Sequence, residues 1–312
     1  MSIAFLFPGQ GSQRPGMLHA LPEHALVRET LEEAGVILDR DVHALDDETA
    51  LLSTIATQLA IFIAGVASAR ALMAEGVEPD FVAGLSVGAY TAAVIGGALA
   101  FSDGLRLVRK RAELTAERFP SGYGLAAIVG LQEQTVAGLA ASCTTREHPV
   151  YLALLNAPQQ MVVAGSIAAL DRVLVEARKS GCTKAERLAV RIPSHCALFD
   201  DVALQMREAM RDLEPRVPQA TYITNRTARP TRNFDRIRED AATNIAYPVR
   251  WHDSAEVLVE MGARLFIEMH PGQVLTRLAA AAFPQVRSIA LEVNSLAQAV
   301  RLAKVARESA VD

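Results

Sequence analysis

Short apolar runs alternate with segments of helical periodicity over the first 121 residues. The runs IAFLF (3–7) and FVAGLS (81–86) have the length and composition of buried strands. Residues 53–75 and AYTAAVIGGALA (89–100) are longer and rich in aliphatic and small residues, so they predict buried helices. This β-α-β-α alternation predicts a parallel sheet covered by helices.

The middle of the chain follows a different order. Residues 122–192 predict strand, helix, strand, strand, helix and strand, which is the ferredoxin-like order. The α/β alternation then resumes, with strands at TYITN, RLFIEM and RSIAL and helices at 197–213, 251–261, VLTRLAAAA and 295–307. We therefore expect an α/β large subdomain (1–121 and 193–312) interrupted by a small α+β subdomain (122–192). A cleft between the two is the expected ligand site.

The stretch GLSVGAY places Gly84, Ser86 and Gly88 at G-x-S-x-G spacing. This spacing is typical of a nucleophile elbow, in which a serine sits on a sharp strand-to-helix turn. An apolar strand precedes the motif and a small-residue helix follows it, which is the required setting. An ordinary tight turn with an inert serine is the alternative. The pattern favours Ser86 as a nucleophile.

A serine nucleophile needs a base, and two of the seven histidines are candidates. His195 lies in RIPSHCALFD, where Pro193 and Ser194 predict the start of a helix beside the expected cleft. His270 follows a predicted strand near the C-terminus, where α/β-hydrolases place their catalytic histidine. No histidine pair has metal-ligand spacing, so we expect no metal site.

One arginine falls on the apolar face of its helix. Ser102 is predicted to cap a helix that runs to Glu117. At about 100° per residue, Arg111 lies in the middle of the apolar arc of LRLVRKRAELT, with no acidic residue on that face of the helix. A buried guanidinium is costly unless it is paired. Its partner is either a distant carboxylate of the protein or a carboxylate of the substrate.

Composition narrows the class of protein. The 312 residues are 51% hydrophobic with a net charge of −4, which indicates a globular protein and disfavours a nucleic-acid groove. Cys143, Cys182 and Cys196 form no C-x-x-C pair, and the N-terminus has no pattern of a targeting segment, so we expect a cytoplasmic location. The apolar run near residues 54–73 contains Gln58 and Arg70, which favours a buried helix over a membrane span.

Four segments together resemble the malonyl-CoA:acyl-carrier-protein transacylases. They are FPGQGSQ (7–13), GLSVGAY, RLVRKRAELT and PSHCALF, with weaker similarity at NIAYPVRW and HPGQVLTRL. The resemblance covers the whole chain. It implies an α/β-hydrolase-like core with a parallel sheet and an inserted ferredoxin-like subdomain. It also implies malonyl-CoA and an acyl carrier protein as partners, with no metal and no cofactor, because the carrier supplies the thiol of its prosthetic arm.

The resemblance also implies a role for each matching residue. Ser86 would take the malonyl group as an ester, His195 would be the general base, and Arg111 would pair with the free carboxylate. The backbone N–H groups of Gln10 and Val87 would form the oxyanion hole. The carbonyl of Asn244 would orient the histidine, and His270 would be a bystander.

Two positions depart from the usual elbow of this family, which is G-H-S-x-G-E. Leu85 stands in place of the histidine and Ala89 in place of the glutamate. The form GLSVGA is similar to the epsilon subunits of bacterial malonate decarboxylase, so the expected acceptor is the decarboxylase carrier. The basic segment 224–236 is predicted to be a solvated loop, although it could instead suit an altered carrier.

Three alternatives remain open. The first is the housekeeping transacylase of fatty-acid synthesis, which differs only in its carrier. The second is a serine hydrolase that uses Ser86 with His270. The third is a non-catalytic assembly subunit that has kept the fold.

Overall fold

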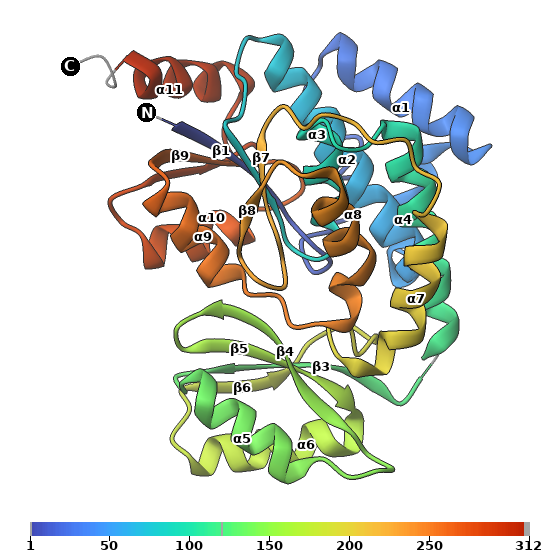
Figure 1. The fold of residues 1–312 in the computed structure, drawn as a ribbon, viewed down its shortest axis with the longest axis vertical. Coiled ribbons are helices and arrows are strands. Elements are labelled where there is room, and N and C mark those ends of the chain that lie inside the picture. The colour runs from blue at the N-terminus through green and yellow to red at the C-terminus, as the bar shows by residue number, and fades with distance from the viewer. Residues whose placement is uncertain (1, 120, 309–312) are drawn as a thin grey trace.

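The large subdomain is built on a six-stranded sheet, in a computed structural model that describes residues 2–119 and 121–308 (Figure 1). The strand order is β10-β9-β1-β2-β7-β8, and all pairs are parallel except the edge pair β7–β8. The strands are β1 (Ser2–Phe7), β2 (Phe81–Gly84), β7 (Thr221–Ile223), β8 (Pro230–Thr231), β9 (Ala263–Glu268) and β10 (Arg287–Ala290). This confirms the predicted parallel α/β core.

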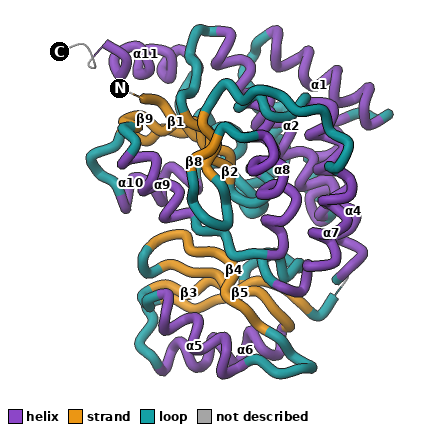
Figure 2. The backbone as a smooth tube through the Cα atoms, in the orientation of Figure 1, coloured by secondary structure: helices purple, strands orange, loops and turns teal. Residues whose placement is uncertain are grey.

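Helices cover both faces of this sheet (Figure 2). Alternate residues of β1 point to opposite sides, so Phe5 packs in the cluster with α2 and α3, whereas Leu6 packs in the cluster with α9 and α10. The helices are α1 (Ala25–Leu38), α2 (Thr54–Ala74), α3 (Gly88–Ile95), α4 (Phe101–Arg118), α7 (Asp200–Ala209), α8 (Phe234–Thr243), α9 (Trp251–Glu260), α10 (Val274–Ala282) and α11 (Leu296–Glu308). Short 3₁₀ turns lie at Val42–Leu45, Ala50–Leu52, Ala197–Phe199 and Asn244–Ala246.

Helix α2 is long and apolar enough to cross a membrane by length and composition alone. However, 89% of its most apolar window is buried inside the structure, where α2 contacts α1, α3, α4 and α11. A helix that is apolar on all sides is the expected centre of a large core. The burial therefore agrees with the prediction of a core helix.

The small subdomain, at the bottom of Figure 1, is an antiparallel four-stranded sheet with two helices on one face. Its elements follow the predicted β-α-β-β-α-β order, and its strands lie in the order β4-β5-β3-β6. They are β3 (Tyr123–Val129), α5 (Glu133–Cys143), β4 (Val150–Ala157), β5 (Gln160–Ser166), α6 (Ile167–Lys179) and β6 (Lys184–Arg187). This is the ferredoxin-like arrangement.

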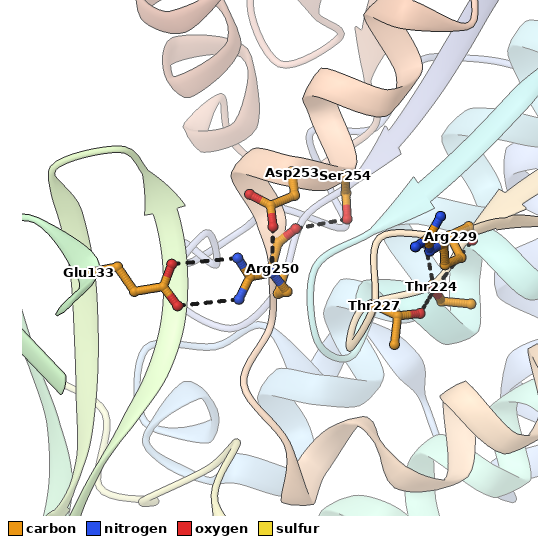
Figure 3. A network of polar contacts seen from close by, with 7 residues as sticks. All are labelled: Glu133, Thr224, Thr227, Arg229, Arg250, Asp253 and Ser254. Atoms are coloured by element: carbon orange, nitrogen blue, oxygen red, sulfur yellow. Dashed lines mark hydrogen bonds and ion pairs between the residues drawn. The ribbon is translucent and has the colours of Figure 1, made fainter. Parts of the chain in front are cut away.

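The two subdomains are joined by direct bonds as well as by the chain. Val249 pairs with the edge of β4, since its N–H donates to Ala153 O (2.9 Å) and its carbonyl accepts from Leu155 N (2.9 Å). Next to it, the Arg250 guanidinium pairs with Glu133 at the start of α5, 3.3 Å away, and with Asp253 in α9 (Figure 3). These contacts fix the small sheet against the large subdomain.

Several local predictions were wrong. Ser102 lies inside α4, whose N-cap is Ala100. The helix start predicted at Pro193 and Ser194 is wrong, because a 3₁₀ turn begins at Ala197 and α7 begins at Asp200, nearer to the other predicted bound of 197. The last strand of the small subdomain ends at Arg187 and does not extend to residue 192. The segment 224–236 is not simply a solvated loop, because it contains β8 and the first turn of α8. Polar side chains and the two-residue length of β8 concealed both elements.

Two glycines allow the turn after β2 to pack against its neighbours. A Cβ on Gly84 would lie 2.0 Å from the carbonyl oxygen of Gly88, and a Cβ on Gly88 would lie 2.2 Å from the carbonyl oxygen of Phe7. Both obstacles are backbone atoms that cannot rotate away. The motif therefore requires glycine at each position for steric reasons, apart from any chemistry at the serine.

We predict that Gly84→Ala destabilises the protein by about 3 kcal/mol or more, because the new methyl group has no space. Gly138→Ala is the matched control, since its Cβ meets nothing within 4 Å on the surface of α5. The control is expected to raise stability by about 0.5–1 kcal/mol, through the helix propensity of alanine. Thermal unfolding of both variants checks this. Equal stability of the two would contradict the steric account.

Candidate active site

Ser86 lies at the turn between β2 and α3, the strand–turn–helix context that the motif predicts. Its φ is +58°, a left-handed conformation that non-glycine residues rarely adopt. Such a residue costs of order 1–3 kcal/mol and persists only when its surroundings enforce it. Its N–H donates to Asn225 Oδ1 (3.0 Å), and its carbonyl accepts from Asn244 Nδ2 (3.3 Å). The backbone on both sides of the serine is therefore held in place.

His195 is the histidine that contacts the serine. Its Nε2 lies 2.7 Å from Ser86 Oγ, and its Nδ1 lies 2.8 Å from the carbonyl oxygen of Asn244. A carbonyl can only accept, so Nδ1 carries the proton and donates to Asn244. Nε2 is left as an acceptor for the serine hydroxyl proton. This is the geometry of a nucleophile and its general base, with a backbone carbonyl as the third member.

The surroundings of His195 keep its ring neutral. The side chain is buried, and this desolvation, together with the nearby Arg111 charge, lowers the pKa of His195 to about 3. The hydrogen bond to Asn244 acts in the opposite direction but is weaker. At neutral pH the ring is thus unprotonated and available to accept a proton.

Arg111 reaches the same serine from α4. It is 2% exposed, its Nη2 donates to Ser86 Oγ (3.1 Å), and its Nη1 donates to Gln58 Oε1 (2.5 Å). Its Nε has no hydrogen-bond partner within residues 2–119 and 121–308, and no carboxylate there lies within 4.0 Å of the guanidinium. Burial lowers the pKa of Arg111 below its usual value. The distant protein carboxylate considered as its partner is not found among these residues.

Two backbone N–H groups near the serine have no protein acceptor in the part of the chain that the structure describes. They belong to Gln10, in the loop after β1, and to Val87, which directly follows the serine. Both residues line the cavity that contains Ser86. Unpaired N–H donors beside a nucleophile can stabilise the oxyanion that forms when the nucleophile attacks a carbonyl carbon.

The cavity has a volume of about 380 Å³ and lies between the two subdomains. The large subdomain contributes the loop after β1, the elbow and the start of α10. The small subdomain contributes Leu125, Leu154 and Val162, and the connection between the subdomains contributes residues 188–190. The cleft predicted between the subdomains therefore contains Ser86, His195 and Arg111. Leu85 is part of its wall, whereas Ala89 is fully buried in the core.

Sequence reasoning missed two residues that contact this site. Gln58 is a buried amide that accepts from Arg111, and its signal was a polar residue inside a mostly apolar helix. Asn225 accepts from the N–H of Ser86 and donates to Gly84 O (2.8 Å). It had no signal, because it lies in the polar segment that predicted only a loop.

His270 does not join the site. It is buried after β9, its N–H donates to Ser68 Oγ (3.3 Å), and it does not line the cavity. The hydrolase hypothesis that paired Ser86 with His270 therefore has no geometric support. Across the residues that the structure describes, no group of three or more His, Cys, Asp or Glu side chains is arranged to hold a metal ion.

The sequence matches the family model described as acyl transferase domain over residues 4–308. It is also 33% identical over 307 residues to the malonyl CoA-acyl carrier protein transacylase of Escherichia coli K12, covering 96% of this chain and 99% of that protein. The chain belongs to the acyl transferase family. This acyltransferase is likewise 33% identical over 294 residues to the transacylase of the same name from Bacillus subtilis 168, with 93% of each chain covered.

Solved structures give the same result. The acyl-carrier-protein S-malonyltransferase of Burkholderia pseudomallei superimposes with a TM-score of 0.91 at 34% identity, covering 96% of this acyltransferase and 100% of that chain. A malonyl-transacylase solved in complex with a type II polyketide-synthase acyl-carrier protein has a TM-score of 0.91 at 31% identity, with 97% and 100% covered. Neither the relatives nor these structures are described as malonate decarboxylase subunits.

We predict that the reaction of Ser86 with a fluorophosphonate probe is independent of pH from about 5 to 8, because the pKa of His195 is lowered to about 3. The labelling rate should fall only as the pH drops toward that value. A histidine of ordinary pKa, about 6.5, would already halve the rate near pH 6.5. His195→Ala should abolish labelling and His270→Ala should retain it. An inflection near pH 6.5 in the wild type would contradict the assignment.

Proposed function

We propose that this acyltransferase moves the malonyl group of malonyl-CoA to the thiol of an acyl carrier protein. The observation that carries the proposal is Arg111, a buried guanidinium with no carboxylate partner among the residues that the structure describes, one hydrogen bond away from the candidate nucleophile. An acyl group on Ser86 that ends in a carboxylate would supply the missing partner. The names of the relatives support the same substrate.

The first half-reaction forms an ester on Ser86. The serine oxygen attacks the thioester carbon while its proton passes to His195 Nε2. The negative charge on the thioester oxygen is stabilised by the N–H groups of Gln10 and Val87. When the C–S bond breaks, the thiolate of CoA accepts that proton from His195 and leaves as a thiol. The malonyl ester remains, with its carboxylate against Arg111.

The second half-reaction repeats these steps with the carrier. His195, neutral again, takes the proton of the incoming thiol, and the sulfur attacks the ester carbon. The C–O bond to Ser86 breaks and the serine recovers its proton from the imidazolium. CoA leaves before the carrier thiol attacks the ester on Ser86, so the proposed mechanism is ping-pong.

The arginine also provides selectivity between acyl groups. An acetyl group on Ser86 would leave the guanidinium buried without an anionic partner, which costs more than a satisfied ion pair. The thioester chemistry is the same for both acyl groups. The difference therefore arises from the group at the far end of the acyl chain.

The carrier is a separate part of the proposal. The compared relatives favour an acyl carrier protein of the fatty-acid or polyketide type. Leu85 and Ala89 are the basis for the alternative, the decarboxylase carrier, and the comparisons give that alternative no support. The free thiols of Cys143, Cys182 and Cys196 agree with the cytoplasmic location that we propose.

We predict that brief mixing with malonyl-CoA adds one malonyl group to the wild type, and that acetyl-CoA adds little. Arg111→Ala should lose this preference by about 100-fold or more, because the charged partner of the carboxylate is gone. Intact-protein mass spectrometry measures both adducts, with Ser86→Ala as the blank. If Arg111→Ala kept the malonyl preference, the proposed role of the guanidinium would be wrong.

The carrier is tested by adding the second substrate to the malonyl-enzyme. One carrier bears phosphopantetheine, and the other is the malonate decarboxylase carrier with its phosphoribosyl-dephospho-CoA arm. We expect faster loss of the malonyl adduct with the phosphopantetheine carrier. Faster transfer to the decarboxylase carrier would reverse the preference and restore the alternative. The apo form of each carrier is the control.

A further inference from the structure

A buried carboxylate lies behind the elbow without touching the cavity. Asp240, on the inner face of α8, is 7% exposed. Its Oδ2 accepts from the hydroxyl of Tyr222 (2.8 Å) and the N–H of Asn225 (2.9 Å), and its Oδ1 accepts from the N–H of Arg226 (3.3 Å). Three donors from one strand and the loop after it thus converge on this side chain.

The Asn225 backbone held by this carboxylate carries the amide that holds the elbow. The Asn225 side chain accepts from the N–H of Ser86 (3.0 Å) and donates to the carbonyl of Gly84 (2.8 Å). These two bonds lie on either side of Leu85, across the turn that forces Ser86 to a φ of +58°. A single amide therefore spans the strained part of the nucleophile turn.

The orientation of the Asn225 side-chain amide depends on the backbone of the loop after β7 that carries it. The loop after β7 is closed from one side by Thr224 Oγ1, which accepts from Arg229 N (2.9 Å) and lies 2.8 Å from Thr227 Oγ1 (Figure 3). On the other side, Asp240 is the acceptor for the N–H of the residue that carries the amide. Without that acceptor, two buried donors would have no partner and the loop could shift.

We propose that Asp240 is a positioning residue for the acyl transfer: it fixes Asn225, which in turn aims Ser86 Oγ at His195 and the Val87 N–H at the oxyanion. In this proposal, Asp240 maintains the Ser86 Oγ–His195 Nε2 distance of 2.7 Å. A displacement of about 1 Å in such a site can cost about 100-fold in rate. The inference rests on the proposed function only for the choice of acyl donor.

The conservative variant Asp240→Asn keeps the hydrogen-bond acceptor and removes the negative charge, so it tests which of the two the site requires. In Asp240→Asn, an amide oxygen at the Oδ2 position can still accept from Tyr222 and Asn225, and only the longer contact to Arg226 N is lost. Asp240→Ala loses all three. Burial raises the pKa of Asp240 to about 6, so assays at pH 8 compare each variant with the ionised wild-type carboxylate.

The experiment measures single-turnover acylation of Ser86 by malonyl-CoA at pH 8. We expect Asp240→Ala to lower the acylation rate constant by about 100-fold, with little change in the half-saturating malonyl-CoA concentration. Asp240→Asn should restore the rate to within about threefold of the wild type. Tyr222→Phe, which removes one donor and keeps the carboxylate, should lie between the two.

Asp46→Ala is the control for a loss of stability alone. Asp46 is another buried carboxylate that accepts from a backbone N–H, that of Leu18 (2.6 Å), but it has no bond to the elbow. Both alanine variants should lower the melting temperature, and only Asp240→Ala should lower the acylation rate. Wild-type acylation by Asp240→Ala, or an equal loss in Asp46→Ala, would overturn the proposal.

Labelling of Ser86 by a fluorophosphonate probe tests the positioning role of Asp240 independently of the proposed malonyl transfer. The probe needs an activated serine but no malonyl group. If the wild type took no malonyl but reacted with the probe, the proposed function would fail while the positioning role would still be tested. Slow labelling of Asp240→Ala with rescue in Asp240→Asn would support the role, and unchanged labelling of Asp240→Ala would refute it.

Discussion

The constraint on which this site depends is a positive charge buried without an anionic partner in the described ranges 2–119 and 121–308. Arg111 is held by neutral acceptors, Gln58 Oε1 and Ser86 Oγ, and lies over the ring of Tyr90, 5.9 Å from its centroid. These contacts satisfy hydrogen bonds but leave the charge uncompensated. The same charge helps to keep His195 neutral, so one residue affects both the base and the binding of the acyl group.

The fold brings this charge to the nucleophile from distant parts of the sequence. The sheet places the elbow at the carboxyl end of β2, where α/β proteins commonly bind ligands. Helix α4 presents Arg111, α2 presents Gln58, and the segment after α8 presents the carbonyl of Asn244. The small subdomain adds apolar side chains to the cavity wall, and Arg111 and His195 are buried, so their charges act in a medium less polar than bulk water. No single helix or strand therefore contains all the groups of the site.

Sequence predicted the parts of the site that leave a local pattern. The spacing around Ser86 indicated the elbow, and helical phase placed Arg111 on a buried face. Choosing between His195 and His270 needed the family resemblance, because periodicity says nothing about which loops meet in space. Helix α8 was missed since its buried stripe is narrow and includes Asp240, and Asn225 was missed with it. The roles of Asp240 and Asn225 depend on hydrogen bonds between residues far apart in the chain, which a single sequence does not reveal.

The most direct test of the central claim is the crystal structure of the malonyl-enzyme, trapped by rapid cooling of wild-type crystals after mixing with malonyl-CoA. The account predicts an ester on Ser86 whose carboxylate lies within hydrogen-bond distance of both Nη atoms of Arg111. The arginine would then have exchanged its contact with Ser86 Oγ for an ion pair. An ester whose carboxylate points to solvent, with Arg111 still bound only to neutral acceptors, would contradict it.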